Sequence, residues 1–178
     1  TAALWRAFSP AAQAVKGWNA YQMGYTPAPG EGREGSGAIC CTAQQPQERR
    51  SAAQAVLLNQ QRPSNLVVRA WSRAEEVTGQ SETGYCVYVD LVHQDGTPSW
   101  GHHASFAVGT HDWQQVELVI HPEKPVRTAT VYVLFRGSHT GRVWFDDVYL
   151  GNEGAEENLL QNPGFEPGAA KRAVLDGI

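Results

Sequence analysis

The sequence predicts an all-β fold in which short antiparallel strands form a sandwich or a barrel. Stretches of alternating apolar and polar residues recur along the chain, each bounded by turn-forming residues, and this pattern is typical of half-buried strands. The chain also contains 18 glycines and 10 prolines, which supply many turns, whereas only 18% of its residues are charged. No convincing amphipathic helix separates the alternating stretches, so the pattern favours an antiparallel β fold over a helical one.

The strands are placed by their alternation and by the breakers between them. Gln61-Arg62-Pro63-Ser64 separates the first two strands, because proline and serine favour turns. Asp95-Gly96-Thr97-Pro98 predicts a strong turn later in the chain. The predicted strands cover residues 53–60, 65–72, 84–94, 104–108, 113–121, 126–136 and 142–150, with a further short one over 157–161.

Two of these strands have clearly different faces. Residues 84–94 place Val87, Val89 and Leu91 on one side, because successive side chains of a strand point in opposite directions. Residues 126–136 alternate in the same way. The side chains expected opposite the apolar faces of these two strands are Tyr88, Asp90, Tyr132 and Arg136.

Length, charge and hydropathy limit the domain organisation and the classes of partner that the chain can bind. The length of 178 residues suits one domain with a hydrophobic core, so we expect a single domain over residues 1–178. A formal charge of −4 argues against a nucleic-acid partner, because binding to phosphates requires a basic surface. No apolar run is long enough to span a membrane.

Three cysteines leave the redox state open. Cys40 and Cys41 are adjacent and Cys86 lies in a predicted strand, so an odd thiol remains whatever pairs form. A disulfide between Cys86 and one of the other two would suit an oxidising compartment. The alternative is that all three thiols are buried as small apolar groups.

Several segments together resemble a known family. Trp144-Phe145-Asp146-Asp147-Val148-Tyr149-Leu150 looks like the closing strand of carbohydrate-binding modules of the family 4, 9, 16 and 22 group, which are galactose-binding-like domains. Residues 158–166, NLLQNPGFE, look like their opening strand, and the run from Gln54 to Leu150 resembles such modules as a whole. The resemblance implies a jelly-roll β-sandwich, a bound structural calcium ion and a sugar-binding face.

The order of these motifs departs from the family pattern, since the opening-strand motif here follows the closing-strand motif. Residues 158–166 either fold back to fill the first-strand position, which is a circular permutation, or begin a following repeat. The first and last strands of a closed sandwich lie close together, so the fold-back requires little change in topology. We therefore favour the fold-back.

The resemblance also implies a set of calcium ligands. The family motif carries over to Asp146 and Glu166, with Asp147 as a weaker candidate, because neighbouring side chains in a strand point to opposite faces. Carboxylate oxygens are the ligands that Ca²⁺ prefers. The alternative interpretation is a solvated pair of carboxylates at the end of a strand.

Aromatic residues are the main candidates for sugar binding, because a flat ring contacts the C–H face of a sugar while polar groups bind its hydroxyls. Trp71, Trp113 and Trp144 lie in predicted strands and are expected in the core. Trp100 follows a turn and is expected in a loop. The predicted sugar-binding residues are Trp100, Tyr88, Trp18, Tyr132, Arg136, His103 and Asp90.

These observations predict a non-catalytic module that binds a polysaccharide or another glycan within a larger secreted or cell-surface protein, beside neighbouring domains. One alternative is a structural or adhesive repeat without a sugar site. Another is a glycan-active enzyme, which needs two carboxylates facing each other across a sugar bond. The acidic pairs of this chain are only neighbours in sequence, so no enzyme activity is expected.

Overall fold

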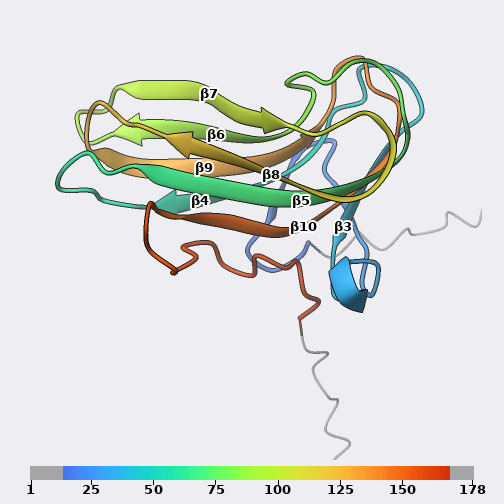
Figure 1. Cartoon of the computed structure of the whole chain (residues 1–178), viewed down its shortest axis with the longest axis horizontal. Coiled ribbons are helices and arrows are strands. Elements are labelled where there is room, and N and C mark those ends of the chain that lie inside the picture. The colour runs from blue at the N-terminus through green and yellow to red at the C-terminus, as the bar shows by residue number, and fades with distance from the viewer. Residues whose placement is uncertain (1–13, 169–178) are drawn as a thin grey trace, which may run out of the picture.

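Two five-stranded antiparallel sheets pack face to face in the computed structural model, which describes residues 14–168 (Figure 1). Sheet A has the strand order β1-β4-β9-β6-β7, and sheet B has the order β2-β3-β10-β5-β8. The strands are β1 (Asn19–Gln22), β2 (Thr26–Pro27), β3 (Ile39–Ala43), β4 (Arg50–Leu57), β5 (Leu66–Val77), β6 (Tyr85–His93), β7 (Pro98–Ser105), β8 (Gly109–Ile120), β9 (Val126–Phe135) and β10 (Gly141–Asn152). One short 3₁₀ turn, η1 (Arg33–Gly35), lies between β2 and β3.

The predicted all-β sandwich is confirmed, and so are most of its predicted strands. Alternation in the sequence predicts these strands because the inward side chains of the two sheets form one core. Val87, Val89 and Leu91 of β6 are all fully buried, as is Val131 of β9. Their neighbours in sequence point out of the sandwich, where Tyr88 is only half-buried.

Some element boundaries differ from the prediction. The strand expected over 104–108 is β7, which begins earlier, at Pro98, so Trp100 lies in a strand rather than in a loop. Residues 157–161 form no strand. The strands β1, β2 and β3 were not predicted. The termini of the expected single domain, residues 1–13 and 169–178, lie outside the described residues.

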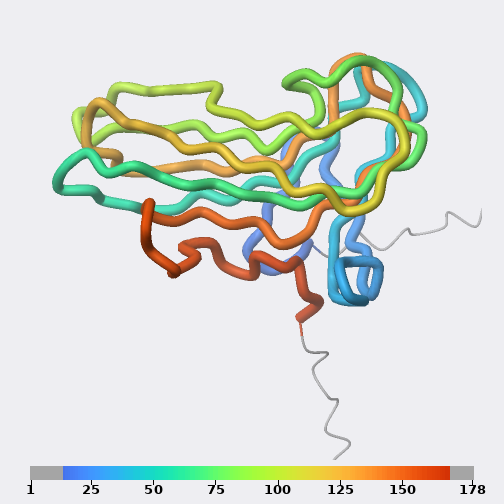
Figure 2. The backbone as a smooth tube through the Cα atoms, viewed as in Figure 1, coloured from blue at the N-terminus to red at the C-terminus, as the bar shows by residue number. Residues whose placement is uncertain are grey.

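Residues 158–166 lie against this same sandwich and follow β10 in an extended course (Figure 2). The peptide N–H of Leu159 donates to the carbonyl of Leu150 at 2.8 Å, and that of Val148 donates to Pro163 at 3.0 Å. Phe165, only 1% exposed, inserts into the core against Trp18. The segment therefore contributes to the core of the described sandwich, while its equivalence to a first strand stays a prediction.

All three cysteines are free thiols. Cys41 and Cys86 are buried, and burial raises the pKa of the Cys86 thiol to about 12. Such thiols are protonated and unreactive at neutral pH. Among residues 14–168, no helix has the length and apolar character needed to cross a membrane.

Candidate functional site

Five of the seven predicted sugar-binding residues lie in strands of sheet A, and a sixth, Arg136, lies next to it. The strand register places Tyr88 of β6 between Tyr132 of β9 and His103 of β7, so their side chains share the outer face of the sheet. Asp90 lies two residues further along β6, on the same side. Arg136 follows the last residue of β9.

A small hollow of about 80 Å³ lies in this outer face, and we call its lining the tyrosine hollow. The rings of Tyr21 and Tyr88 each approach that of Tyr132 edge-on, at 5.1 Å and 5.9 Å between centroids. The Arg136 guanidinium lies 5.7 Å from the Tyr88 ring centre. Tyrosine rings therefore stand beside a cation and a carboxylate. The hollow is lined by Tyr21, Tyr88, Asp90, Tyr132, Leu134 and Arg136.

The tyrosines of this hollow keep their hydroxyl protons at neutral pH. Burial, and after it the negative charge of Asp90, raises the pKa of Tyr88 and of Tyr132 above the ordinary value. A neutral phenol both donates and accepts hydrogen bonds, which suits the hydroxyl groups of a ligand.

Trp100 stands at the rim of the same sheet and is the most exposed of the large apolar side chains in the described residues, at 71%. The register of β7 against β6 shifts here, between Val89 and Leu91. The peptide N–H of Gly101, whose φ is +86°, donates to Oδ1 of Asp90 at 3.1 Å. Asp90 thus fixes the bulge that presents Trp100, and His103 bonds the carbonyl of Gly101 from the other side.

The prediction for Trp18 is wrong, because this side chain is only 1% exposed and belongs to the core. Its ring lies 4.6 Å from that of Phe165, and its indole N–H donates to the carbonyl of Asn162 at 2.9 Å. The aromatic residue that sequence reasoning missed is Tyr21, which is 42% exposed on β1. All four residues of β1 are exposed, so no burial pattern marked it as a strand.

The three predicted metal-ligating carboxylates gather around Gly164. A methyl group added to this glycine would lie 3.5 Å from Oδ1 of Asp147, 3.5 Å from Oε1 of Glu166 and 3.8 Å from Oδ1 of Asp146. Asp147 reaches this position because its φ of +46° belongs to a bulge that shifts β10 against β5. Asp146 and Asp147 are adjacent in sequence, and the bulge turns the carboxylates of both toward Gly164.

The carboxylates of this cluster are the type of ligand that a hard cation prefers, but they are not arranged at the distances of a bound ion. Ca²⁺ binds carboxylate and carbonyl oxygens at about 2.3–2.6 Å. Within residues 14–168, no three acidic, histidine or cysteine side chains are already arranged to hold one ion.

Asp146 is the buried member of the cluster, with no exposed surface. Burial raises its pKa to about 6, even though the N–H of Arg33 donates to its Oδ2 at 2.8 Å. The nearby charge of Asp147 raises the pKa further. Asp147 itself pairs with the Arg33 guanidinium at 2.6 Å. Arg33 is therefore the cation that balances the cluster in the described residues.

The opposite outer face, on sheet B, carries the tryptophans expected in the core. Trp144 is buried, at 3% exposed, but Trp71 and Trp113 are half-buried on the surface, so their prediction is wrong. Arginines cover these rings, with Arg33 over Trp71 at 3.8 Å and Arg73 over Trp144 at 3.9 Å. The stacking explains how large rings remain on a strand's solvent side.

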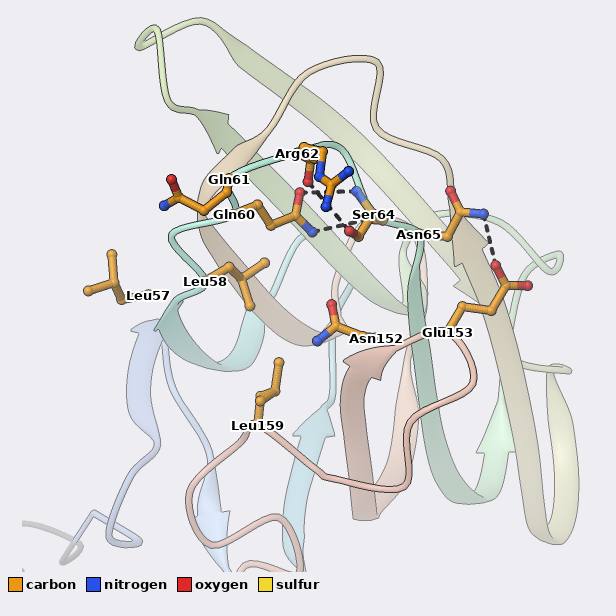
Figure 3. A pocket seen from close by; sticks show the side chains of 10 residues that line it. All are labelled: Leu57, Leu58, Gln60, Gln61, Arg62, Ser64, Asn65, Asn152, Glu153 and Leu159. Carbon is orange, nitrogen blue, oxygen red and sulfur yellow. Dashed lines mark hydrogen bonds between the residues drawn. The ribbon is translucent and has the colours of Figure 1, made fainter.

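A larger hollow, of about 560 Å³, lies elsewhere, at one end of the sandwich (Figure 3). It is lined by leucines, by amide-bearing side chains, by Ser64 and by the charged Arg62 and Glu153, and none of its ten lining residues is aromatic. We therefore regard the smaller tyrosine hollow as the candidate sugar site.

Comparison with known proteins finds no family model that matches the chain. The chain is 33% identical over 100 residues to the tRNA nuclease WapA of Bacillus subtilis strain 168 and to the tRNA3(Ser)-specific nuclease WapA of Bacillus spizizenii. The match covers 54% of this chain and 4% of each relative, so the chain spans a small part of the length of these relatives. The expectation that this chain has no enzyme activity is contradicted by this finding, because the curated relatives are named as nucleases.

Solved structures share the fold. The CBM22-1 xylan-binding domain from Paenibacillus barcinonensis Xyn10C superposes with a TM-score of 0.57 at 9% identity, over 80% of this chain and 89% of that domain. A family 16 carbohydrate-binding module superposes with a TM-score of 0.52 at 14% identity, over 71% of this chain and 84% of that one. The chain therefore has the jelly-roll fold of carbohydrate-binding modules.

Proposed function

We propose that the outer face of sheet A binds a glycan, and that the chain serves as the glycan-binding module of a longer secreted or cell-surface protein. The observation that carries this proposal is the tyrosine hollow, in which three tyrosine rings stand beside Asp90 and Arg136. The fold shared with carbohydrate-binding modules supports it, although sandwiches of one fold host many functions.

The chemistry of the hollow suits a sugar. Ring faces and edges of Tyr21, Tyr88 and Tyr132 contact the C–H groups of a pyranose, while the carboxylate of Asp90 and the guanidinium of Arg136 bind its hydroxyls. Trp100 at the rim adds a further ring for a neighbouring sugar unit. Each hydrogen bond replaces one to water, so the net gain per bond is small and binding is weak for a single site.

The test is retention of the protein by soluble polysaccharides in native gels, followed by titration with an oligosaccharide of the retaining class. Tyr132→Ala is expected to weaken binding at least about tenfold, because it removes the ring that contacts both other tyrosines; a tenfold loss corresponds to about 1.4 kcal/mol. Tyr149→Ala, which alters a half-buried tyrosine on the outer face of sheet B, is the matched control.

Equal retention of the two variants would overturn the placement of the site on sheet A. Absence of retention by every polysaccharide tested would favour the alternative, a structural or adhesive repeat with no sugar site.

The names of the relatives support a second candidate for the longer protein, which is cleavage of tRNA. The relevant observation is the 33% identity over 100 residues, because it links this chain to proteins named as nucleases. The test compares tRNA cleavage by this chain and by the longer protein. Activity confined to the longer protein would place the chemistry outside these residues.

A structural Ca²⁺ ion held by Asp146, Glu166 and Asp147 is part of the same proposal. When bound, the ion would offset two of the three negative charges around Gly164 and link β10 to residues 158–166. The melting temperature is expected to rise in calcium chloride relative to a chelator, as a ligand that binds only the folded state stabilises it. Glu166→Gln should reduce this rise, whereas Glu157→Gln should leave it unchanged.

A further inference from the structure

A second hollow adjoins the tyrosine hollow, and the two share Arg136 as a lining residue. The second hollow has a volume of about 260 Å³, and we call it the arginine hollow. Because Arg136 lines both, a sugar chain that lies on the tyrosine rings can continue directly into the arginine hollow. The arginine hollow is lined by Gln47, Arg49, Glu82, Thr83, Gly84, Arg136 and Gly137.

Two arginines lie side by side in the arginine hollow. The pairing of β4 with β9 ends at Arg50 and Phe135, and antiparallel strands run in opposite directions, so the next residues, Arg49 and Arg136, come opposite each other. Like charges directly opposite each other are unfavourable in a sheet. An anion bound between the two guanidinium groups would remove this repulsion.

The backbone that carries these arginines is held in place by neighbouring segments. The N–H of Arg136 donates to the carbonyl of Gly84 at 2.8 Å, and the N–H of Met23 donates to the carbonyl of Arg49 at 2.8 Å. The two positive groups are therefore brought together by the fold itself, before any ligand binds. A site of this kind loses little free energy to ordering its main chain on binding.

The acids that line the two hollows are engaged by other groups. Oε1 of Glu82 accepts from the hydroxyl of Ser138 at 3.4 Å and lies 3.6 Å from Nε2 of His139. Oδ1 of Asp90 accepts from the N–H of Gly101 at 3.1 Å. The positive charge of the arginine hollow is therefore not offset by direct ion pairs with its own acids.

From this arrangement we infer that the glycan bound on sheet A is acidic, with a carboxylate or phosphate group of one sugar unit held between Arg49 and Arg136. Guanidinium groups bind the oxygens of such groups through paired, charge-assisted hydrogen bonds. Gln47 and Thr83 supply an amide and a hydroxyl for the hydroxyl groups of the same unit. The chain has a formal charge of −4, so selection of an anion depends on this local pair rather than on long-range attraction. The inference rests on the proposed glycan site and adds the class of ligand to it.

The probes are two charged polysaccharides, polygalacturonate for the carboxylate and phosphorylated dextran for the phosphate. Each is compared in native gels with its neutral counterpart, which is methyl-esterified polygalacturonate or unmodified dextran. Retention by one charged polymer is expected to exceed that by its neutral counterpart at least about tenfold, because hydrogen bonds to charged groups are the stronger ones. The polymer that is retained identifies the anionic group.

Arg49→Gln is the main variant, because Arg49 lines the arginine hollow and not the tyrosine hollow. It should weaken retention by the charged polymer at least about tenfold and leave retention by the neutral polymer unchanged. The matched control is Arg142→Gln, which removes the same charge from an exposed arginine on β10 of sheet B and should change neither.

Equal retention by charged and neutral polymers, or equal losses in Arg49→Gln and Arg142→Gln, would overturn the inference and leave the proposed glycan site standing. Absence of retention by all four polymers would overturn both. Retention by a charged polymer that is lost in Arg49→Gln but kept in Tyr132→Ala would also contradict the inference, because the anion would then bind without a glycan on the tyrosine rings.

Discussion

Phe165→Ala is expected to lower the free energy of unfolding by about 3–5 kcal/mol, because it removes a fully buried ring and leaves a cavity against Trp18. For a domain of this size each kcal/mol shifts the melting temperature by roughly 2–4 °C, so the midpoint should fall by about 6–20 °C. Thermal and denaturant unfolding monitored by tryptophan fluorescence measure the change.

The matched control is Glu157→Ala, which alters an exposed residue just before the same segment and should leave stability within about 0.5 kcal/mol. The comparison also decides between the two interpretations of residues 158–166. A segment that begins a following repeat would contribute nothing to this core, and Phe165→Ala would then unfold at the same temperature as the parent chain.

The strands that sequence predicted best are those buried on one face. β6 and β9 lie in the middle of sheet A, where every second side chain must enter the core, and this constraint produces their alternation. β1 lies at the edge with all four residues exposed, and β2 has only two residues, so neither carries a burial pattern. Edge position, rather than weak signal alone, explains why these strands were missed.

The residues of the candidate site that could be predicted are likewise those in strands buried on one face. Tyr88, Asp90 and Tyr132 were assigned to an outer face by the alternation of their own strands, and the register brings them together. Trp18 has no such periodic context, and its indole N–H is satisfied by a carbonyl 144 residues away. Contacts over that distance in sequence are set by tertiary packing, which local pattern does not contain.

Trp71 and Trp113 illustrate a different limit. Large rings in strands are usually core residues, but here Arg33 of η1 covers Trp71 and Arg73 of the neighbouring strand β5 covers Trp113 from the solvent side. The sequence contains both the rings and the arginines, yet their contacts depend on the pairing of β5 with β8 and on the placement of η1 beside β10. The face that a bulge-containing strand presents cannot be counted from residue spacing alone.

In the presence of a chelator, the chain is expected to lose stability as pH rises from about 4 to about 6, because of Asp146. Its folded pKa of about 6 lies above the ordinary value of 3.8, so the folded state keeps a proton that the unfolded state has released. Stability falls with pH wherever the folded state binds more protons. A shift of this size corresponds to at most about 3 kcal/mol.

Unfolding in urea at closely spaced pH values measures this slope, and Asp146→Asn should remove it. Asp95→Asn is the control, since Lys124 and Thr97 hold the pKa of that exposed carboxyl below its usual range. The effect of Asp95 therefore has the opposite sign and occurs below about pH 4, outside the window of Asp146.

Calcium should change the pH slope as well as the midpoint. An ion bound by the carboxylates around Gly164 favours the charged form of Asp146, which lowers the folded pKa and removes the loss of stability between pH 4 and 6. The same urea series repeated in calcium chloride is the measurement. An unchanged slope would mean that no ion reaches Asp146, so that Arg33 alone balances the cluster, and the calcium proposal would then fail even if the pKa of Asp146 is raised.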